Sequence, residues 1–387
     1  MSADCRALIS DRIRQSGPIT VAEFMDLALY APGVGYYARA TQRSGRTGDF
    51  YTSVDVGSLF GTLLAEAFAD MFARVREAAV PDAGVLDLVE AGAGNGRLSR
   101  DVLDALGPRH PSLYAGLRLT LVERSADARA AQPATLAGHA ARVAGSGPDL
   151  PASIEGVLFA NELLDALPVH VVQMTREGLG EIYVGLDGDA LVERLAPPST
   201  PALAAHLDAA GVALAPGQRG EINLAALDWV RTAAARLRRG FLVLVDYGDE
   251  AAALYSPARP MGTLASFSRH MIDAPAASRG TPPWLSDPGS RDLTSHVDFT
   301  SIRREAERAG LFTAGRVTQS AFLLNLALRG GILAEVQAPD RLRERLALKT
   351  LLGPGGLGTT HSVMIFGTQV DTADVAGLSG APPAGWM

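Results

Sequence analysis

Residues 89–100 read VEAGAGNGRLSR and follow a short apolar run, so we expect a strand to end here and a helix to begin. Glycines at positions 92, 94 and 96 allow the backbone to turn sharply and allow a ligand to approach the main chain. The stretch therefore predicts a ligand-binding loop of an α/β fold. An ordinary tight turn between a strand and a helix is the alternative.

The residues of this loop restrict the class of ligand. A dinucleotide fingerprint would place glycines at positions 92, 94 and 97, but position 97 is Arg. A P-loop would end in Gly-Lys-Ser/Thr, and this loop does not. Glu90 at the end of the strand would repel a pyrophosphate and attract a cationic group. S-adenosylmethionine carries a sulfonium and an ammonium group and no phosphate, so it fits such a loop.

The composition of the 387 residues is that of a globular, enzyme-sized protein, with 47% hydrophobic and 20% charged residues. A net charge of −7 argues against a broad nucleic-acid-binding surface. The single cysteine, Cys5, excludes an internal disulfide bond and a cysteine-based metal cluster. No apolar run approaches membrane-spanning length, and the first residues show no signal core, so we expect a cytoplasmic location.

Strands alternate with helices in the middle of the chain. Apolar runs predict buried strands at residues 85–92, 117–123, 156–162 and 241–248. Helical patterns between them favour a parallel sheet covered on both faces. Residues 169–195 alternate between apolar and polar side chains instead, which predicts an antiparallel insertion.

Helical patterns surround this core. Residues 3–30 are predicted to form two helices, with Thr20 capping the second. A short helix, LLDAL, is expected directly after the third strand. Further predicted elements are helices at 56–79, 298–309 and 319–336 and a late strand, HSVMIFGTQ.

Acidic and polar residues follow the predicted strands, where open parallel sheets bind their ligands. Glu123 ends the second strand and fits an acid that accepts hydrogen bonds from both hydroxyls of a ribose. Nicotinamide enzymes use an acid in the same way, so this feature does not separate the two cofactors. An exposed charge at a strand end is the simpler alternative for Glu123.

Asn161, Glu162 and Asp165 follow the third strand. Glu162 and Asp165 are three residues apart, so they would share one face of a helix. Two carboxylates beside a methyl donor suit a cationic acceptor, because they can hold a guanidinium group and accept its proton. A helix start capped by Asn161 is the alternative, and local propensity alone favours it.

Three further residues are candidates for lining the substrate pocket: Asp246, Tyr247 and His296. A strand-ending turn is the alternative for the first two, and Asp298 near His296 is explained well as a helix cap. The seven histidines show no paired spacing, so we expect no metal site. The sequence also has no Gly-x-Ser-x-Gly motif of a serine hydrolase.

Taken together, these stretches resemble the MidA-like family of S-adenosylmethionine-dependent methyltransferases, which includes a mitochondrial protein arginine methyltransferase that assists complex I assembly. The resemblance covers roughly residues 17–368. The stretches that carry it occur in the order of the family: GPITVAEFMDLALYAPGVGYY, GDFYTSVDVGSLFGTLLAE, VEAGAGNGRL, LVERSADARAAQ, FANELLDALPVH, GQRGEINLAALDW, LVDYG, LTSHVDF and TQSAFLL.

The resemblance implies a Rossmann-like class I methyltransferase fold with an N-terminal helical arm, an antiparallel insertion and C-terminal additions. It implies S-adenosylmethionine as the cofactor and Glu162 and Asp165 as catalytic residues that orient the acceptor and take up its proton. The residues implied to bind the cofactor are Glu90, Gly92, Gly94, Gly96, Glu123, Asn161, Gly48, Thr52 and Ser53. The implied domains are an arm with a lid loop (1–80), a core with an insertion near 169–220 (81–260), C-terminal elements (261–370) and a loose tail (371–387).

Methylation of arginine in a protein or peptide acceptor is the leading hypothesis. We expect no nucleic-acid or membrane partner, and a homodimer is one option for the oligomeric state. The alternatives are a methyltransferase for a small metabolite or modified peptide, a non-catalytic assembly factor and a nicotinamide oxidoreductase. Two features depart from the family and affect the acceptor pocket. Val54-Asp55 stands where the family often has Pro-Glu, and the loop at 273–290 is unusually long.

Overall fold

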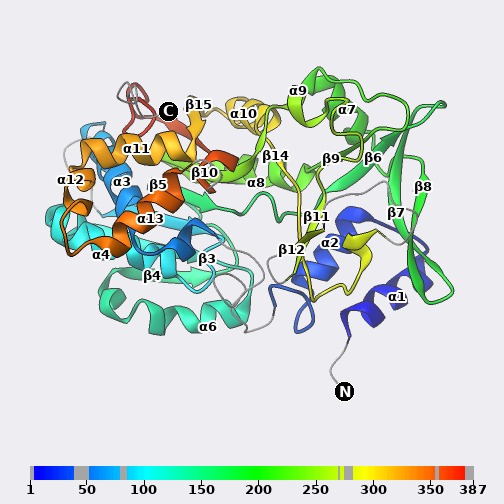
Figure 1. The fold of residues 1–387 in the computed structure, drawn as a ribbon, viewed down its shortest axis with the longest axis horizontal. Helices are drawn as coiled ribbons and strands as arrows, with labels where there is room; N and C mark the ends of the chain where they lie inside the picture. Colours follow the sequence, from blue (N-terminus) through cyan, green and yellow to red (C-terminus); the bar gives the residue numbers. More distant parts are fainter. Residues whose placement is uncertain are drawn as a thin grey trace. The chain divides into compact units, whose positions relative to one another are not determined.

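The chain folds into two compact units, each assembled from three segments of the sequence (Figure 1). The computed structural model describes residues 4–38, 52–78, 85–268, 271–273, 282–353 and 357–379. Unit 1 comprises residues 1–51, 164–229 and 248–305, and unit 2 comprises residues 52–163, 230–247 and 306–387. The predicted domain ranges are contiguous, unlike these units, and they stay a prediction.

Unit 2 is built on a mostly parallel sheet with the strand order β15-β16-β10-β5-β2-β3-β4. Its strands are β2 (Leu86–Ala91), β3 (Leu117–Val122), β4 (Val143–Gly147), β5 (Ile154–Asn161), β10 (Leu237–Asp249), β15 (Phe312–Thr318) and β16 (His361–Thr368). All neighbours along this order pair in parallel except β16, which is antiparallel to β10 and β15. The direction of strand addition reverses between β2 and β5, as in other doubly wound sheets. The predicted α/β fold is confirmed.

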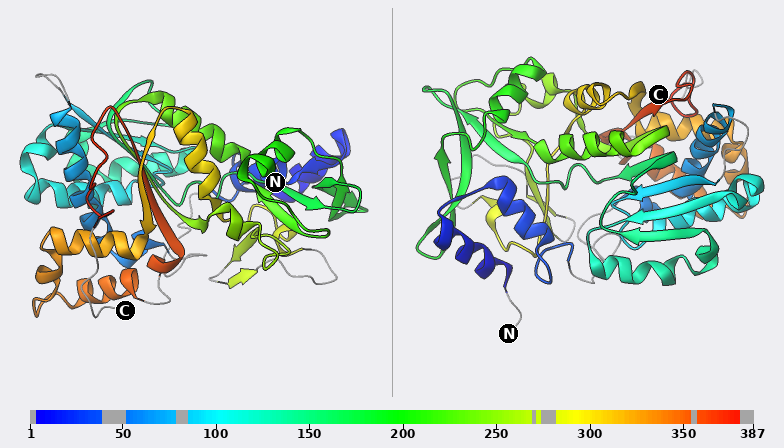
Figure 2. Two further views of the ribbon diagram at one scale, coloured as in Figure 1. Left: turned by 90° about the horizontal axis from the view of Figure 1, so that it is seen from above. Right: turned by 180° about the vertical axis from the view of Figure 1, so that it is seen from behind.

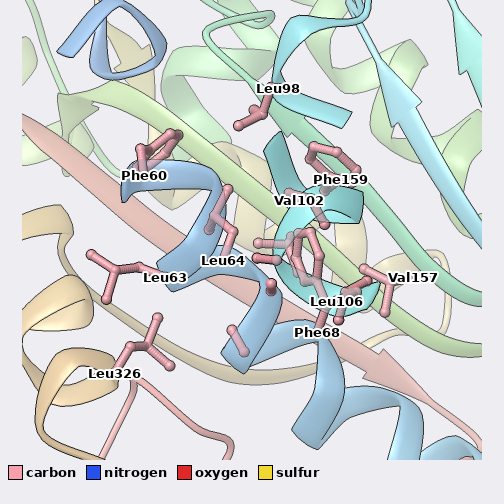
Figure 3. Packing of buried hydrophobic residues seen from close by; sticks show 14 of the residues in the cluster. Phe60, Leu63, Leu64, Phe68, Leu98, Val102, Leu106, Val157, Phe159 and Leu326 are labelled. Atoms are coloured by element: carbon pink, nitrogen blue, oxygen red, sulfur yellow. The ribbon is translucent and has the colours of Figure 1, made fainter. Parts of the chain in front are cut away.

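The apolar side chains of these strands are covered by helices. Every residue of β2 is buried, as expected for a parallel strand with helices on both faces. Figure 3 shows Phe68 packed against Phe159 of β5, with ring centroids 5.0 Å apart. The helices that contribute to this core include α3 (Leu59–Glu77), α4 (Arg97–Arg109) and α11 (Gln319–Arg329).

Residues 371–379 are packed into unit 2 instead of forming part of a loose tail. Val375 is fully buried in the core, and Arg74 donates hydrogen bonds to the carbonyl oxygens of Ala373 (2.6 Å) and Asp374 (3.0 Å). The prediction of a loose tail is therefore wrong for this part. The remaining helices of unit 2 are η1 (Ser53–Val56), α5 (Pro111–Ala115), α6 (Ala126–Thr135), η2 (Ala137–Arg142), α12 (Ile332–Val336), α13 (Leu342–Leu352) and α14 (Leu357–Thr360).

Unit 1 is built on an antiparallel sheet that joins the N-terminal segment to the predicted insertion. Its strands are β1 (Ile19–Thr20), β6 (His170–Met174), β7 (Leu179–Asp187), β8 (Ala190–Ala196) and β9 (Arg219–Ile222). Figure 2 shows α1 (Cys5–Ser16) and α2 (Val21–Tyr30), in blue, beside the green strands with which they share an apolar core. Thr20 caps α2 as predicted, because its hydroxyl accepts the backbone N–H of Glu23 at 3.1 Å. The antiparallel insertion is confirmed.

The rest of unit 1 consists of short elements that the sequence pattern did not predict in full. These are α7 (Ala202–Ala210), α9 (Ala251–Leu254), β11 (Ala265–Ser268), β12 (Met271–Asp273), η3 (Pro283–Leu285), β13 (Asp292–Thr294) and β14 (Val297–Asp298). A boundary between the units falls within α8 (Leu224–Arg236) and another within α10 (Phe299–Arg308).

Gly156 allows a test of the close contact between β2 and β5. Its φ angle is 148°, and a Cβ added there would lie 2.1 Å from the carbonyl oxygen of Asp87. We expect Gly156→Ala to lower the free energy of unfolding by at least about 2 kcal/mol, because the neighbouring strand would have to move. Gly145→Ala in β4 is the control, since a Cβ there meets no atom within 4 Å. Urea unfolding followed by circular dichroism measures both variants. Equal unfolding midpoints for the two variants would show that the close contact between β2 and β5 does not require glycine at position 156.

Candidate functional site

The glycine loop connects the end of β2 to the start of α4. Gly92, Gly94 and Gly96 have φ angles of 71°, 50° and 82°, which residues with side chains rarely adopt. The Gly92 N–H donates to the carbonyl of Val122 at 2.9 Å and so holds the loop against β3. A Cβ at Gly94 would meet no atom within 4 Å, whereas one at Gly92 or Gly96 would approach a leucine side chain to 3.2 Å. The middle glycine therefore leaves space for a ligand beside the backbone.

Glu123 is bonded to the middle of this loop. Its Oε2 accepts the N–H of Gly94 at 2.9 Å, and its Oε1 accepts the N–H of Ser125 at 2.7 Å. Each carboxylate oxygen has a further lone pair, so both oxygens can still accept a hydroxyl group. This half-buried and fixed position is not that of a freely exposed charge, and it suits the predicted contact with a ribose. The contact itself stays a prediction.

Glu90 is buried beneath the loop and faces the first turn of α4. Its Oε2 accepts the backbone N–H of Ser99 at 3.2 Å and also the Ser99 hydroxyl. Burial raises the pKa of Glu90 to about 8, although the hydrogen bonds from Ser99 act in the opposite direction. At pH 7 this carboxyl group is therefore mostly protonated in the ligand-free protein. A cation bound nearby would lower its pKa and restore the negative charge.

Residues 52–56 lie beside the glycine loop because Arg97 holds them there. Arg97 donates to the Asp55 carboxylate at 3.0 Å and to a backbone carbonyl at 2.7 Å. Asp55 in turn accepts the N–H and the hydroxyl of Thr52, and Ser53 is fully buried. The arginine that breaks the dinucleotide fingerprint thus has a structural role of its own. Gly48, also predicted to bind the cofactor, lies outside the described residues.

A turn follows β5 where the sequence predicted the helix LLDAL. The N–H of Glu162 donates to the carbonyl of Val245 at 2.8 Å, and Glu162 has a positive φ angle of 52°. This bond to β10 and the left-handed conformation keep the chain out of a helix. The helix prediction is therefore wrong, and the alternative in which Asn161 caps a helix is excluded with it.

Glu162 belongs to a cluster at the carboxyl ends of β5 and β10. Asn161 Nδ2 donates to Glu162 Oε1 at 3.2 Å, and His361 Nε2 lies 3.8 Å from the same oxygen. The His361 ring contacts the Tyr247 ring edge to face, with centroids 5.4 Å apart. Asp246 is 1% exposed and accepts the N–H of Tyr247 at 2.9 Å. The structure thus brings four predicted site residues together with one that was not predicted.

His361 is the member of this cluster that the sequence did not reveal. It begins β16, which runs antiparallel to β10, and it pairs directly with Tyr247. The first residue of an antiparallel strand lies at the edge where the parallel strands end, so a search restricted to residues after strands misses it. The signal that could have found it is a histidine placed directly before the last apolar run.

Asp165 and His296 are described within unit 1. The N–H of Ser295 donates to the carbonyl of Asp165 at 3.0 Å, so the chain before His296 lies beside Asp165. The Asp165 side chain is buried. Asp298 accepts the N–H of Ser301 at 3.1 Å, which supports the helix-cap explanation for Asp298.

The residues of unit 2 at this edge fit S-adenosylmethionine. The Gly94 backbone is open, Glu123 lies beside it, and the buried Oδ1 of Asn161 has no hydrogen-bond partner among the described residues. An orphaned acceptor and ionisable acids suit the ammonium and sulfonium groups of this cofactor better than a pyrophosphate. Within the described ranges, no three His, Cys, Asp or Glu residues are grouped so as to hold a metal ion. No helix among the described residues is long and apolar enough to cross a membrane.

Comparison with known proteins agrees with this geometry. Residues 63–317 match the family described as "Putative S-adenosyl-L-methionine-dependent methyltransferase". The mitochondrial protein arginine methyltransferase NDUFAF7 of Mus musculus is 30% identical over 353 residues, covering 82% of this chain and 72% of that protein. Its Homo sapiens counterpart is 28% identical over 382 residues, covering 90% and 79%. A COG1565 superfamily member from Burkholderia thailandensis, crystallised with S-adenosyl-homocysteine, is 31% identical with a TM-score of 0.82, covering 95% of this chain and 93% of that chain.

These comparisons confirm the class I methyltransferase fold and correct one expectation. The cytoplasmic location expected from the sequence is contradicted, because the matching proteins of Mus musculus, Danio rerio, Homo sapiens and Drosophila melanogaster are named as mitochondrial. That expectation rested on the lack of an apolar signal core and of an apolar run of membrane-spanning length. The family match spans well over half of the chain, so the chain belongs to this family and is an S-adenosylmethionine-dependent methyltransferase.

Proposed function

We propose that this enzyme methylates arginine side chains of a protein acceptor, with Glu162 orienting the guanidinium group and taking up its proton. The position of Glu162 carries the proposal, because it follows a strand that pairs directly with the strand before the glycine loop. The names of the matching mouse and human proteins, which are protein arginine methyltransferases, support the choice of acceptor.

The two oxygens of the Glu162 carboxylate have different surroundings. Oε1 accepts from Asn161 and lies 3.8 Å from His361. Oε2 has no hydrogen-bond partner among the residues that the structure describes. The Glu162 side chain is 16% exposed, so an acceptor can reach it. A guanidinium N–H can therefore donate a charge-assisted hydrogen bond to Oε2 while Oε1 fixes the carboxylate plane.

The chemistry of arginine explains why a carboxylate is needed here. When bound, S-adenosylmethionine supplies an electrophilic methyl group on its sulfonium centre. The acceptor nitrogen must lie in line with that methyl group, but a guanidinium is protonated at neutral pH and is a poor nucleophile. Glu162 would hold the acceptor in place and receive the proton at Oε2 when the acceptor nitrogen takes the methyl group. The sulfur–methyl bond would break in the same transfer, and the neutral thioether S-adenosylhomocysteine would leave. Exchange with solvent would then return the carboxylate.

The cofactor is proposed to lie at the same edge of unit 2. Glu123 would accept the ribose hydroxyls, and Asn161 Oδ1 would accept from the ammonium group. The residues proposed to surround the methionine part are Glu90, Gly92, Gly94, Gly96, Thr52 and Ser53. Asp246 and Tyr247 are proposed on the acceptor side. Asp165 is proposed as the second catalytic acid, as the family resemblance implies, and His296 is proposed as a contact to the substrate.

Glu123→Gln tests the placement of the ribose. The amide keeps the size of the side chain but loses the charge and one acceptor, so affinity for S-adenosylhomocysteine should fall by about 1–3 kcal/mol. Asp127→Asn, an exposed acid in the next helix, controls for the loss of a nearby charge and should bind as the wild type does. Calorimetry on the three proteins measures the difference. An unchanged affinity of Glu123→Gln for S-adenosylhomocysteine would show that Glu123 does not bind the ribose.

Glu162→Gln tests the proposed role in methyl transfer. Transfer of labelled methyl groups into proteins of a cell lysate should slow by roughly two to four orders of magnitude, the range for a positioned acid–base group. Affinity for S-adenosylhomocysteine should stay the same, because the change is on the acceptor side. Glu155→Gln, at the opposite end of β5, is the matched control and should retain full activity. A full-speed Glu162→Gln enzyme would refute the arginine mechanism and favour a neutral acceptor.

A further inference from the structure

We propose that His361 is a positioning residue that fixes the direction of the Glu162 carboxylate. The inference deepens the proposed function and rests on it for the consequence in methyl transfer. The contact between the two side chains can be measured separately, in the protein without any acceptor.

The fold places His361 at the end of the sheet and restricts its ring. His361 pairs with Tyr247 at the last position of the ladder between β10 and β16. Alternate residues of a strand point to opposite faces, so His361 shares a face with Val363, which is part of the apolar core. The side chain is buried, with 5% of the residue exposed. The edge-to-face contact with Tyr247 limits rotation of the imidazole.

The two ring nitrogens of His361 have different neighbours. Nδ1 lies 3.0 Å from the hydroxyl of Thr360, and Nε2 lies 3.8 Å from Glu162 Oε1. The longer distance is beyond a hydrogen bond, so the contact with Glu162 is an ion pair only when the imidazole is protonated. The attraction is then stronger than it would be in water, because the histidine is buried.

Two charged groups near β16, Asp246 and Arg316, lie beside the residue that follows His361. Asp246 pairs with Ser362, the residue after His361, and Arg316 of β15 donates to the Ser362 hydroxyl at 3.2 Å. The side chain of Ser362 points away from the face of His361. Asp246, Arg316 and Tyr247 are retained in every variant described below. A change that follows the removal of Glu162 or His361 therefore reports on that pair.

Histidine resonances give the direct test. The chain has seven histidines, and the signal that disappears in His361→Phe identifies the ring. In the ligand-free protein, Glu162→Gln should lower the pKa of His361 by about one unit or more, since an opposite charge is removed. His110, whose Nε2 lies 3.3 Å from Glu66 Oε1, is an internal control and should titrate as before. An unchanged titration of His361 would overturn the proposal.

The pH dependence of methyl transfer tests the consequence. His361→Phe keeps an aromatic ring against Tyr247 but removes both nitrogens. Loss of the imidazole removes the group that lies beside the Glu162 carboxylate, so the acid limb of the rate profile should move by about one unit. Affinity for S-adenosylhomocysteine should not change. His110→Phe removes the His110–Glu66 pair and should leave the profile in place.

The combined results separate this inference from the proposed function. Both proposals would be supported by three results together. These are a His361 titration that changes in Glu162→Gln, slow methyl transfer by Glu162→Gln, and a shifted pH profile for His361→Phe. A slow Glu162→Gln enzyme with a wild-type profile for His361→Phe would overturn the positioning role alone. A full-speed Glu162→Gln enzyme with coupled titration would overturn the proposed function. If His361→Phe does not fold, the titration in Glu162→Gln still decides whether the contact exists, with the ring then assigned through His361→Gln.

Discussion

The parallel pairing of β2 with β5 is the contact on which the site depends. The ladder runs from Asp87 opposite Gly156 to Ala91 opposite Ala160, so the two strands end at the same level. β2 ends at Ala91 and is followed by Gly92, and β5 ends at Asn161 and is followed by Glu162. Gly92 and Glu162 both have positive φ angles. Because strand order reverses between β2 and β5, their carboxyl ends lie at the position where such sheets bind ligands.

Three acids near this edge have different surroundings. Burial raises the pKa of Glu90 to about 8, so its charge depends on what is bound nearby. Glu123 accepts two backbone N–H groups, which fix its carboxylate beside the loop. Glu162 lies beside His361. A cofactor with cationic groups and no phosphate would meet acidic side chains at this edge. The guanidinium of Arg97, which begins α4, is occupied by Asp55.

Local patterns were sufficient to predict the central strands, the antiparallel insertion and the polar residues that follow strands. Asn161, Glu162, Asp246 and Tyr247 were predicted as site residues in this way. Only Glu162 follows its strand, since Asn161 belongs to β5 and Asp246 and Tyr247 belong to β10. The four lie together because parallel strands share one carboxyl edge. Contacts between distant segments were not predictable. Glu162 N bonds to Val245 and prevents the expected helix, and His361 reaches the site only because β16 is antiparallel. Val375 packs in the core although its surroundings in the sequence look like a tail.

The identity of the methylated residue is the most direct test of the account. The purified enzyme would be incubated with S-adenosylmethionine labelled in the methyl group and with a lysate of the source cell, which is then separated into protein and small-molecule fractions. The account predicts label in the protein fraction that is recovered as methylarginine after acid hydrolysis. Label confined to small molecules, or recovered from protein on another amino acid, would contradict the assignment of Glu162 to a guanidinium acceptor.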